Sequence, residues 1–121
     1  MCYNIVVTPK FEEDINYYRK KKKFTNITDD LDGIMDRISR GELIGDPITD
    51  IKIPQQDSVY KVRAVNTNTN QGKKNGYRVI YYAMKEDKTV YLLTVYYKKE
   101  DKSIPTKKKI KALIEEYCTY L

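Results

Sequence analysis

Basic side chains recur in three segments between residues 60 and 99 whose composition is typical of β-strands. The segments read YKVRAV from residue 60, GYRVIYY from residue 76 and YLLTVYYKK from residue 91. Because side chains alternate between the two faces of a strand, Lys61 and Arg63 share one face. In an antiparallel sheet, Arg78 and one of Lys98 or Lys99 join that face. Cations gathered in this way repel one another, and RNA phosphate is the anion that we expect to compensate them.

The residue types also limit the chemistry of such a site. The chain has no histidine, so acid–base catalysis must use lysine, arginine, tyrosine or carboxylates. Cleavage of RNA by its own 2′-hydroxyl requires removal of that proton, neutralisation of charge on the phosphate and protonation of the leaving 5′-oxygen. Arginine suits the second role because its planar fork pairs with phosphate and stays charged. A lysine serves the first role only where neighbouring cations lower its pKa. We expect such a site to be slow without a partner that orients the substrate.

Length and charge indicate one small basic domain spanning residues 1–121. The net charge is +6 and is unevenly distributed along the chain. Residues 1–60 carry 9 Lys/Arg and 11 Asp/Glu, a net charge of −2, whereas residues 61–121 carry 14 and 6, a net charge of +8. A basic half that also holds the best strand patterns favours nucleic acid as a partner.

The two cysteines, Cys2 and Cys118, lie near the chain ends without a C-x-x-C spacing or a histidine. This pattern argues against a metal site, and we expect no cofactor. A disulfide between the chain ends is one alternative, and reduced thiols in a cytoplasmic protein are the expected one. No apolar run approaches the roughly 20 residues that span a bilayer, so we expect a soluble, cytoplasmic protein without membrane contact.

The first half of the chain predicts a strand followed by two helices. Residues 3–7 form a short apolar strand, and Thr8, followed by proline, begins the first helix. Either Thr25 or Thr28 caps a second helix with an apolar stripe, and Gly41 is expected to end it.

The second half predicts the sheet and a last helix. Residues 48–54 form a short strand or an extended connection, and the polar segment 66–76 is expected to be a mobile loop. A C-terminal helix begins at Thr106. The expected fold is therefore α+β, with an antiparallel sheet of about four strands, two N-terminal helices and one C-terminal helix.

This order of elements resembles the RelE/ParE superfamily of bacterial toxins, and its HigB-like members in particular. The resemblance covers nearly the whole chain and depends on the three basic strand segments in their order. It implies a RelE-like fold and a ribosome-dependent mRNA endonuclease that cleaves without a metal. It also implies three partners: the ribosome, mRNA and a cognate antitoxin of the helix-turn-helix, HigA-like type that silences the toxin.

The resemblance also implies the site residues. Lys61 and Arg63 match the paired basic positions of the family's second strand, and Arg78 matches the arginine after Gly-Tyr. The basic pair after the last strand corresponds to Lys98 and Lys99. We further expect three residues to contact RNA: Lys73, Lys74 and Tyr97.

Two features depart from the family pattern. The RelE branch has a tyrosine shortly after the last basic pair, whereas residues 103–105 contain none. Some HigB branches use a C-terminal histidine, which this chain lacks. Either Tyr96 or Tyr97 is left to supply an aromatic surface.

Other functions remain open at this point. ParE-like members keep the fold but act on DNA gyrase and lack the basic set, so Lys61, Arg63 and Arg78 argue against that class. The same three residues also fit a non-catalytic RNA-binding or interaction module, in which they form a solvated sheet face.

Overall fold

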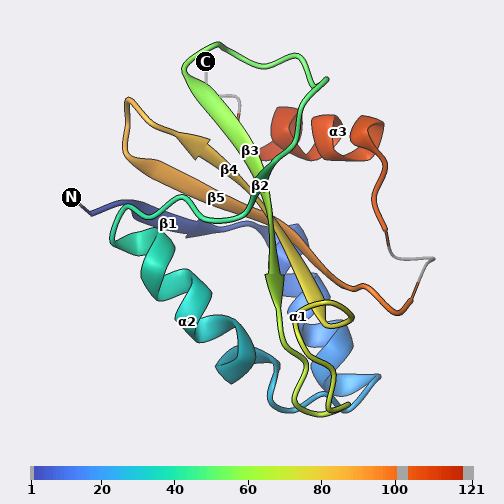
Figure 1. The fold of residues 1–121 in the computed structure, drawn as a ribbon. Coiled ribbons are helices and arrows are strands. Elements are labelled where there is room, and N and C mark those ends of the chain that lie inside the picture. The colour runs from blue at the N-terminus through green and yellow to red at the C-terminus, as the bar shows by residue number, and fades with distance from the viewer. Residues whose placement is uncertain (1, 101–103, 119–121) are drawn as a thin grey trace.

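The computed structural model describes residues 2–100 and 104–118 and shows an α+β fold, as expected (Figure 1). Ser103, in the segment that lacks the family tyrosine, lies outside the described residues. The elements in chain order are β1 (Asn4–Val7), α1 (Pro9–Lys20), α2 (Ile27–Ser39), β2 (Asp46–Pro47), β3 (Asp57–Ala64), β4 (Tyr77–Met84), β5 (Thr89–Tyr97) and α3 (Lys107–Tyr117). Two N-terminal helices and one C-terminal helix were expected, and this is confirmed.

The sheet differs from expectation in two respects. Its strand order is β1-β5-β4-β3-β2, which makes five strands in the described residues instead of about four. It is also mixed, because β1 pairs parallel with β5 while the other neighbours are antiparallel. Of the two alternatives for residues 48–54, a short strand or an extended connection, the structure shows the connection, and the segment that pairs is Asp46–Pro47, opposite Lys61 and Tyr60.

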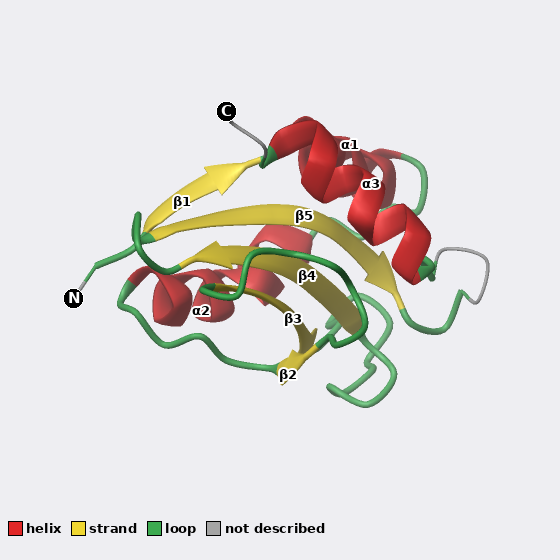
Figure 2. Cartoon of the chain, turned by 90° about the horizontal axis from the view of Figure 1, so that it is seen from above, coloured by secondary structure: helices red, strands yellow, loops and turns green. Residues whose placement is uncertain are grey.

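Helices cover both faces of the sheet, and each face has its own apolar cluster. Figure 2 shows α2 and α3 on opposite sides of the strands. Alternating residues of β4 divide between the clusters: Tyr77, Val79 and Tyr81 join the cluster with α1 and α2, whereas Ile80 and Tyr82 join the one with α3. The two faces of β4 are thus both apolar over most of their length, as in a strand buried on two sides.

The starts of α1 and α3 are set by local sequence. The Thr8 hydroxyl accepts a hydrogen bond from the Phe11 amide at 3.3 Å, and Thr106 accepts from the Lys109 amide at 3.1 Å. Both threonines therefore cap a helix, as expected. Gly41, which follows α2 with a φ of 97°, also has the expected role, because this left-handed conformation suits glycine at a helix end.

The start of α2 was predicted wrongly. The capping residue is Asn26, not Thr25 or Thr28, and its side chain makes no capping hydrogen bond. Instead, the Asn26 amide donates to Asn68 at 2.7 Å and its side chain donates to Thr67 at 2.9 Å. The helix start is therefore fixed by the 66–76 loop, and this loop is in turn anchored to α2.

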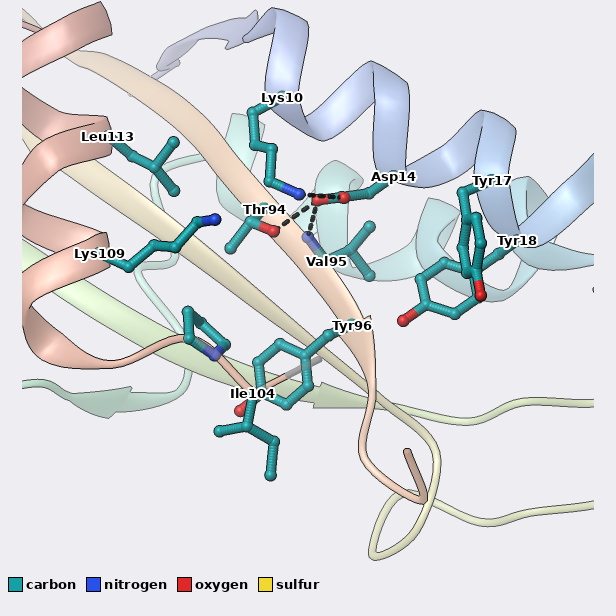
Figure 3. Close-up of a pocket in the computed structure, with 11 residues that line it drawn as sticks. Lys10, Asp14, Tyr17, Tyr18, Thr94, Val95, Tyr96, Ile104, Lys109 and Leu113 are labelled. Carbon is teal, nitrogen blue, oxygen red and sulfur yellow. Dashed lines mark hydrogen bonds and ion pairs between the residues drawn. The ribbon is translucent and has the colours of Figure 1, made fainter. Parts of the chain in front are cut away.

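Side chains of α1 cover the edge of β5 that β1 leaves free. Beyond Leu92, where β1 ends, the Val95 amide donates to the Asp14 carboxylate at 3.2 Å, and the Tyr97 amide donates to the Tyr18 hydroxyl at 2.8 Å. Asp14 also accepts from Thr94 and pairs with Lys10 (Figure 3). An uncovered strand edge invites pairing with other chains, and these contacts prevent that here.

We expect Asp14→Ala to lower the free energy of unfolding by about 1–3 kcal/mol, because it leaves a strand amide and a hydroxyl without their acceptor. Urea denaturation monitored by circular dichroism measures this change. The neighbouring Glu13→Ala, which removes an exposed carboxylate from the same helix, should change stability by less than about 0.5 kcal/mol. Equal effects of the two variants would contradict the assigned role of Asp14.

Both cysteines are free thiols, one exposed and one buried. Burial raises the pKa of the Cys118 thiol to about 12, with a further contribution from Asp57. The reactive thiolate of Cys118 is therefore scarce in the folded protein at pH 8.

We expect a thiol reagent at pH 8 to label Cys2 rapidly and Cys118 only after denaturation. Counting the thiols that react before and after addition of denaturant tests this, with Cys2→Ser as the control that should show no rapid labelling. Two rapidly reacting thiols in the folded wild type would show that the end of α3 opens in solution.

Candidate nucleic-acid interface

The structure brings together three of the expected site residues on one face of the sheet. Arg63 of β3 lies directly opposite Arg78 of β4, and Lys61 lies opposite Ile80. Lys61, Arg63 and Arg78 lie on the same face of the sheet as α3. However, α3 packs on Val59, Ile80 and Tyr82, toward the other end of β3 and β4. We call Lys61, Arg63 and Arg78 the cationic face.

Arg78 is the buried member of the cationic face, at 4% exposure. Its guanidinium donates to three backbone carbonyls, those of Lys73 and Lys74 at 2.8 Å and that of Tyr77 at 3.2 Å. Burial, and then the neighbouring Arg63, lower the pKa of Arg78, yet an arginine remains charged near neutral pH. Arg78 therefore holds the 66–76 loop against the sheet while it contributes a positive charge.

The other two members of the cationic face are accessible to a ligand. Arg63 is exposed and Lys61 is half-buried. Within residues 2–100 and 104–118, none of the three cations lies within 4.0 Å of a carboxylate. In the sheet register Lys61 lies opposite the carboxylate of Asp46, whereas Arg63 lies opposite another cation, Arg78. Because like charges directly opposite each other in a sheet are destabilising, the Arg63–Arg78 pair favours binding of an anion.

Of the two tyrosines left open by the sequence, Tyr96 lies beside the cationic face. It is opposite Arg78 in the register, and burial raises the pKa of its phenol although Arg78 acts in the other direction. Tyr97 lies on the opposite face, where its ring contacts Phe24 at 5.3 Å between centroids and its hydroxyl donates to Thr69. Alternation along the strand predicts that the two tyrosines separate, but only the register shows which of them faces Arg78.

The remaining expected lysines lie at the end of the sheet that carries Arg63 and Arg78. Lys73 and Lys74 are exposed in the loop whose carbonyls Arg78 binds. Lys98 and Lys99 follow β5 in an exposed turn, and the Lys98 amide donates to the Gly76 carbonyl at 2.8 Å. These lysines lie in the loops at this end of the sheet, and none of them belongs to a strand of the cationic face.

A separate pocket of about 240 Å³, which sequence reasoning did not find, lies between α1, β5 and α3 next to Tyr96 (Figure 3). Lys10 and Lys109 reach into it, and Asp14 lies between Lys10 and the strand. The Asp14 carboxylate accepts hydrogen bonds from Lys10, Thr94 and the Val95 amide, so among the described residues this pocket presents ammonium groups and no unpaired carboxylate.

Comparison with known proteins does not assign a family. No protein-family model matches this chain, and no curated protein matches its sequence. Among the described residues, no helix is both long and apolar enough to cross a membrane, and no group of three or more Cys, Asp or Glu side chains is placed to hold a metal ion. The functional assignment therefore depends on the site and on the resemblance of the sequence.

Proposed function

We propose that this protein is a RelE-like toxin that cleaves mRNA on the ribosome. The observation that carries the proposal is the pairing of Arg63 with Arg78, next to Lys61, with no carboxylate within 4.0 Å of any of the three among the described residues. Asp46 lies opposite Lys61 in the register, so the Arg63–Arg78 pair is the stronger part of this observation. A folded protein tolerates such repulsion where function requires it, and phosphate relieves it. The α+β fold with its two N-terminal helices and one C-terminal helix also fits the resemblance.

The residues suggest a division of roles in the reaction. Arg63 and Lys61 are accessible and would bind the scissile phosphate, where charge-assisted contacts stabilise the developing charge. Tyr96, whose raised pKa keeps the phenol protonated, can donate a proton or a hydrogen bond but is a poor base. The site has no histidine, so the ribosome would supply the orientation that aligns the 2′-hydroxyl with the phosphate.

The partners follow from the same proposal. A cognate antitoxin of the helix-turn-helix, HigA-like type would neutralise the toxin in the cytoplasm, with an acidic segment near the basic half of the chain. Complementary charge accelerates such an association and favours one register.

One observation favours a second candidate function, a non-catalytic RNA-binding module. The Arg78 guanidinium already donates to three backbone carbonyls, so in this conformation only part of its fork remains for phosphate. In that case the cationic face would bind RNA without cleaving it.

Mapping of RNA ends after induction of the protein in bacteria distinguishes these functions. The toxin proposal expects new 5′ ends in phase with codons, in translated messages only, and no such ends after induction of Arg63→Gln. RNA binding in vitro without new ends would support the binding module. A DNA-damage response without new ends would instead indicate a gyrase poison and overturn the proposal.

A further inference from the structure

A groove of about 480 Å³ runs along the outer edge of β3, next to the cationic face. Its walls come from α2, from the segment that precedes β2, from β3 itself and from the 66–76 loop. The lining residues are Ile34, Arg37, Ile44, Gly45, Asp46, Lys61, Val62, Arg63 and Lys73.

The groove exists because β2 is only two residues long. It pairs with Tyr60 and Lys61, so no strand of the described residues lies on the outer side of β3 from Val62 to Ala64. Just before β2, Gly45 comes so close to β3 that an added Cβ would lie 2.6 Å from the Lys61 carbonyl oxygen. The Gly45 φ of 108° also requires glycine. These constraints turn the chain away from β3 and leave its edge open beyond Lys61.

Positive charge predominates in the groove. It contains four cations, Arg37, Lys61, Arg63 and Lys73, and one carboxylate, Asp46. Arg37 is paired with Glu42 at 3.2 Å, but both side chains are about half exposed, so this pair is weak. Lys61 and Arg63 are two residues apart on a strand, which separates them by about 7 Å along the edge.

We propose that this groove binds the backbone of single-stranded RNA next to the cationic face, with Arg37 and Lys73 as phosphate contacts. The inference rests on the proposed function for its choice of RNA. It adds to that function a path for the strand, from the cationic face around the sheet edge to α2. Arg37 has no counterpart among the residues that the sequence resemblance implies.

Arg78 takes part in this path as a positioning residue. Its guanidinium binds the carbonyls of Lys73 and Lys74, which fixes the loop segment from which Lys73 reaches the groove. One buried arginine thus connects the cationic face with the far wall of the groove.

The shape of the groove favours RNA over an added peptide strand. A peptide that extends a sheet gains affinity from main-chain hydrogen bonds along the edge. The open edge of β3 covers only residues 62–64, because Gly45 and β2 cover it before that point and the turn that begins at Asn66 ends it. What the groove offers instead is a row of cations, and cations contribute most of the affinity for a nucleic-acid backbone.

Fluorescence anisotropy with a labelled 12-nucleotide RNA tests the proposal. Methylation of the 2′-hydroxyls prevents cleavage, and titration of the full chain at several salt concentrations gives the affinity and its salt dependence. Arg37→Gln and Lys73→Gln should each weaken binding about three- to tenfold at low salt and reduce the slope of log K against log salt by about 0.7. Arg40→Gln and Lys85→Gln, which remove the same charge from exposed positions outside the groove, should change affinity by less than about twofold.

Three results would overturn the proposal. The first is that the wild type does not bind this RNA. The second is that all four variants weaken binding equally, which indicates an effect of net charge alone. The third is that Arg37→Gln and Lys73→Gln weaken binding of a poly-glutamate peptide and leave RNA binding unchanged, which indicates a protein-docking surface. Failure of the proposed function is distinguishable from these results. If groove variants weaken RNA binding as expected but induction in bacteria yields no codon-phased ends, the RNA-binding role of the groove is supported and the nuclease function is rejected.

Discussion

Replacement of Arg78 by alanine is expected to reduce mRNA cleavage by about 10²–10³-fold and the free energy of unfolding by about 2–3 kcal/mol. In the proposed function, the loss of activity follows from removal of a cation next to the expected position of the scissile phosphate and from release of the loop that carries Lys73. The loss of stability follows because this buried guanidinium donates to the carbonyls of Lys73, Lys74 and Tyr77. Cleavage of a ribosome-bound message under single-turnover conditions measures the first effect, and urea denaturation measures the second.

Arg78→Lys separates the two roles of this residue. Lysine keeps the charge but has no planar fork to bind two carbonyls at once. If Arg78 acts mainly by its charge on phosphate, Arg78→Lys should retain much of the activity. If it acts mainly by positioning the loop, Arg78→Lys should resemble Arg78→Ala. Arg19→Ala, which removes an exposed arginine from α1, is the control for both measurements. Full cleavage by a folded Arg78→Ala variant would exclude Arg78 from the site.

Features with a local cause could be predicted from the sequence. The start of α1 at Thr8 and the start of α3 at Thr106 depend on a side chain and an amide three residues later, and both predictions are confirmed. The shared face of Lys61 and Arg63 likewise follows from strand alternation alone. The stop of α2 at Gly41 depends on one residue's tolerance of positive φ.

Features that depend on distant segments could not be predicted. The start of α2 is fixed by contacts of Asn26 with Thr67 and Asn68, about 40 residues further along the chain. The first strand in the sequence, β1, pairs in parallel with the last strand, β5, and no local sequence pattern indicates this pairing. The register irregularity between Ile80 and Tyr81 also had no sequence signal.

The environment of the candidate site also depends on distant segments and could not be predicted. Sequence reasoning identified the cations but not their environment, because the burial of Arg78 arises when the 66–76 loop folds back over the sheet end. Arg37 gave no signal of its own, since a single arginine on a helix is usually solvated. It gains its candidate role only because the short β2 leaves a groove between α2 and β3.

The opposition of Arg63 and Arg78 leads to the second large expected effect, in which activity and stability change in opposite directions. If the proposed nuclease function is right, Arg63→Glu should reduce RNA cleavage by at least about 10²-fold, because it replaces an accessible cation, proposed to bind phosphate, with an anion. The same change should raise the free energy of unfolding by about 0.2–1 kcal/mol, because an opposite-charge pair across two strands replaces a like-charge pair. Such a gain in stability with a loss of activity is typical of positions selected for function.

Salt dependence provides the decisive measurement for this variant. Urea denaturation at low and high salt should show that the wild type gains stability as salt screens the Arg63–Arg78 repulsion, whereas Arg63→Glu loses part of its advantage. Arg63→Gln, which removes the charge without adding an anion, should lie between them in stability and still cleave RNA poorly. If Arg63→Glu is less stable than the wild type at every salt concentration, the two arginines do not repel each other in the free protein. The charges of the cationic face would then already be compensated within the protein, and the main physical support for an anionic ligand would be lost.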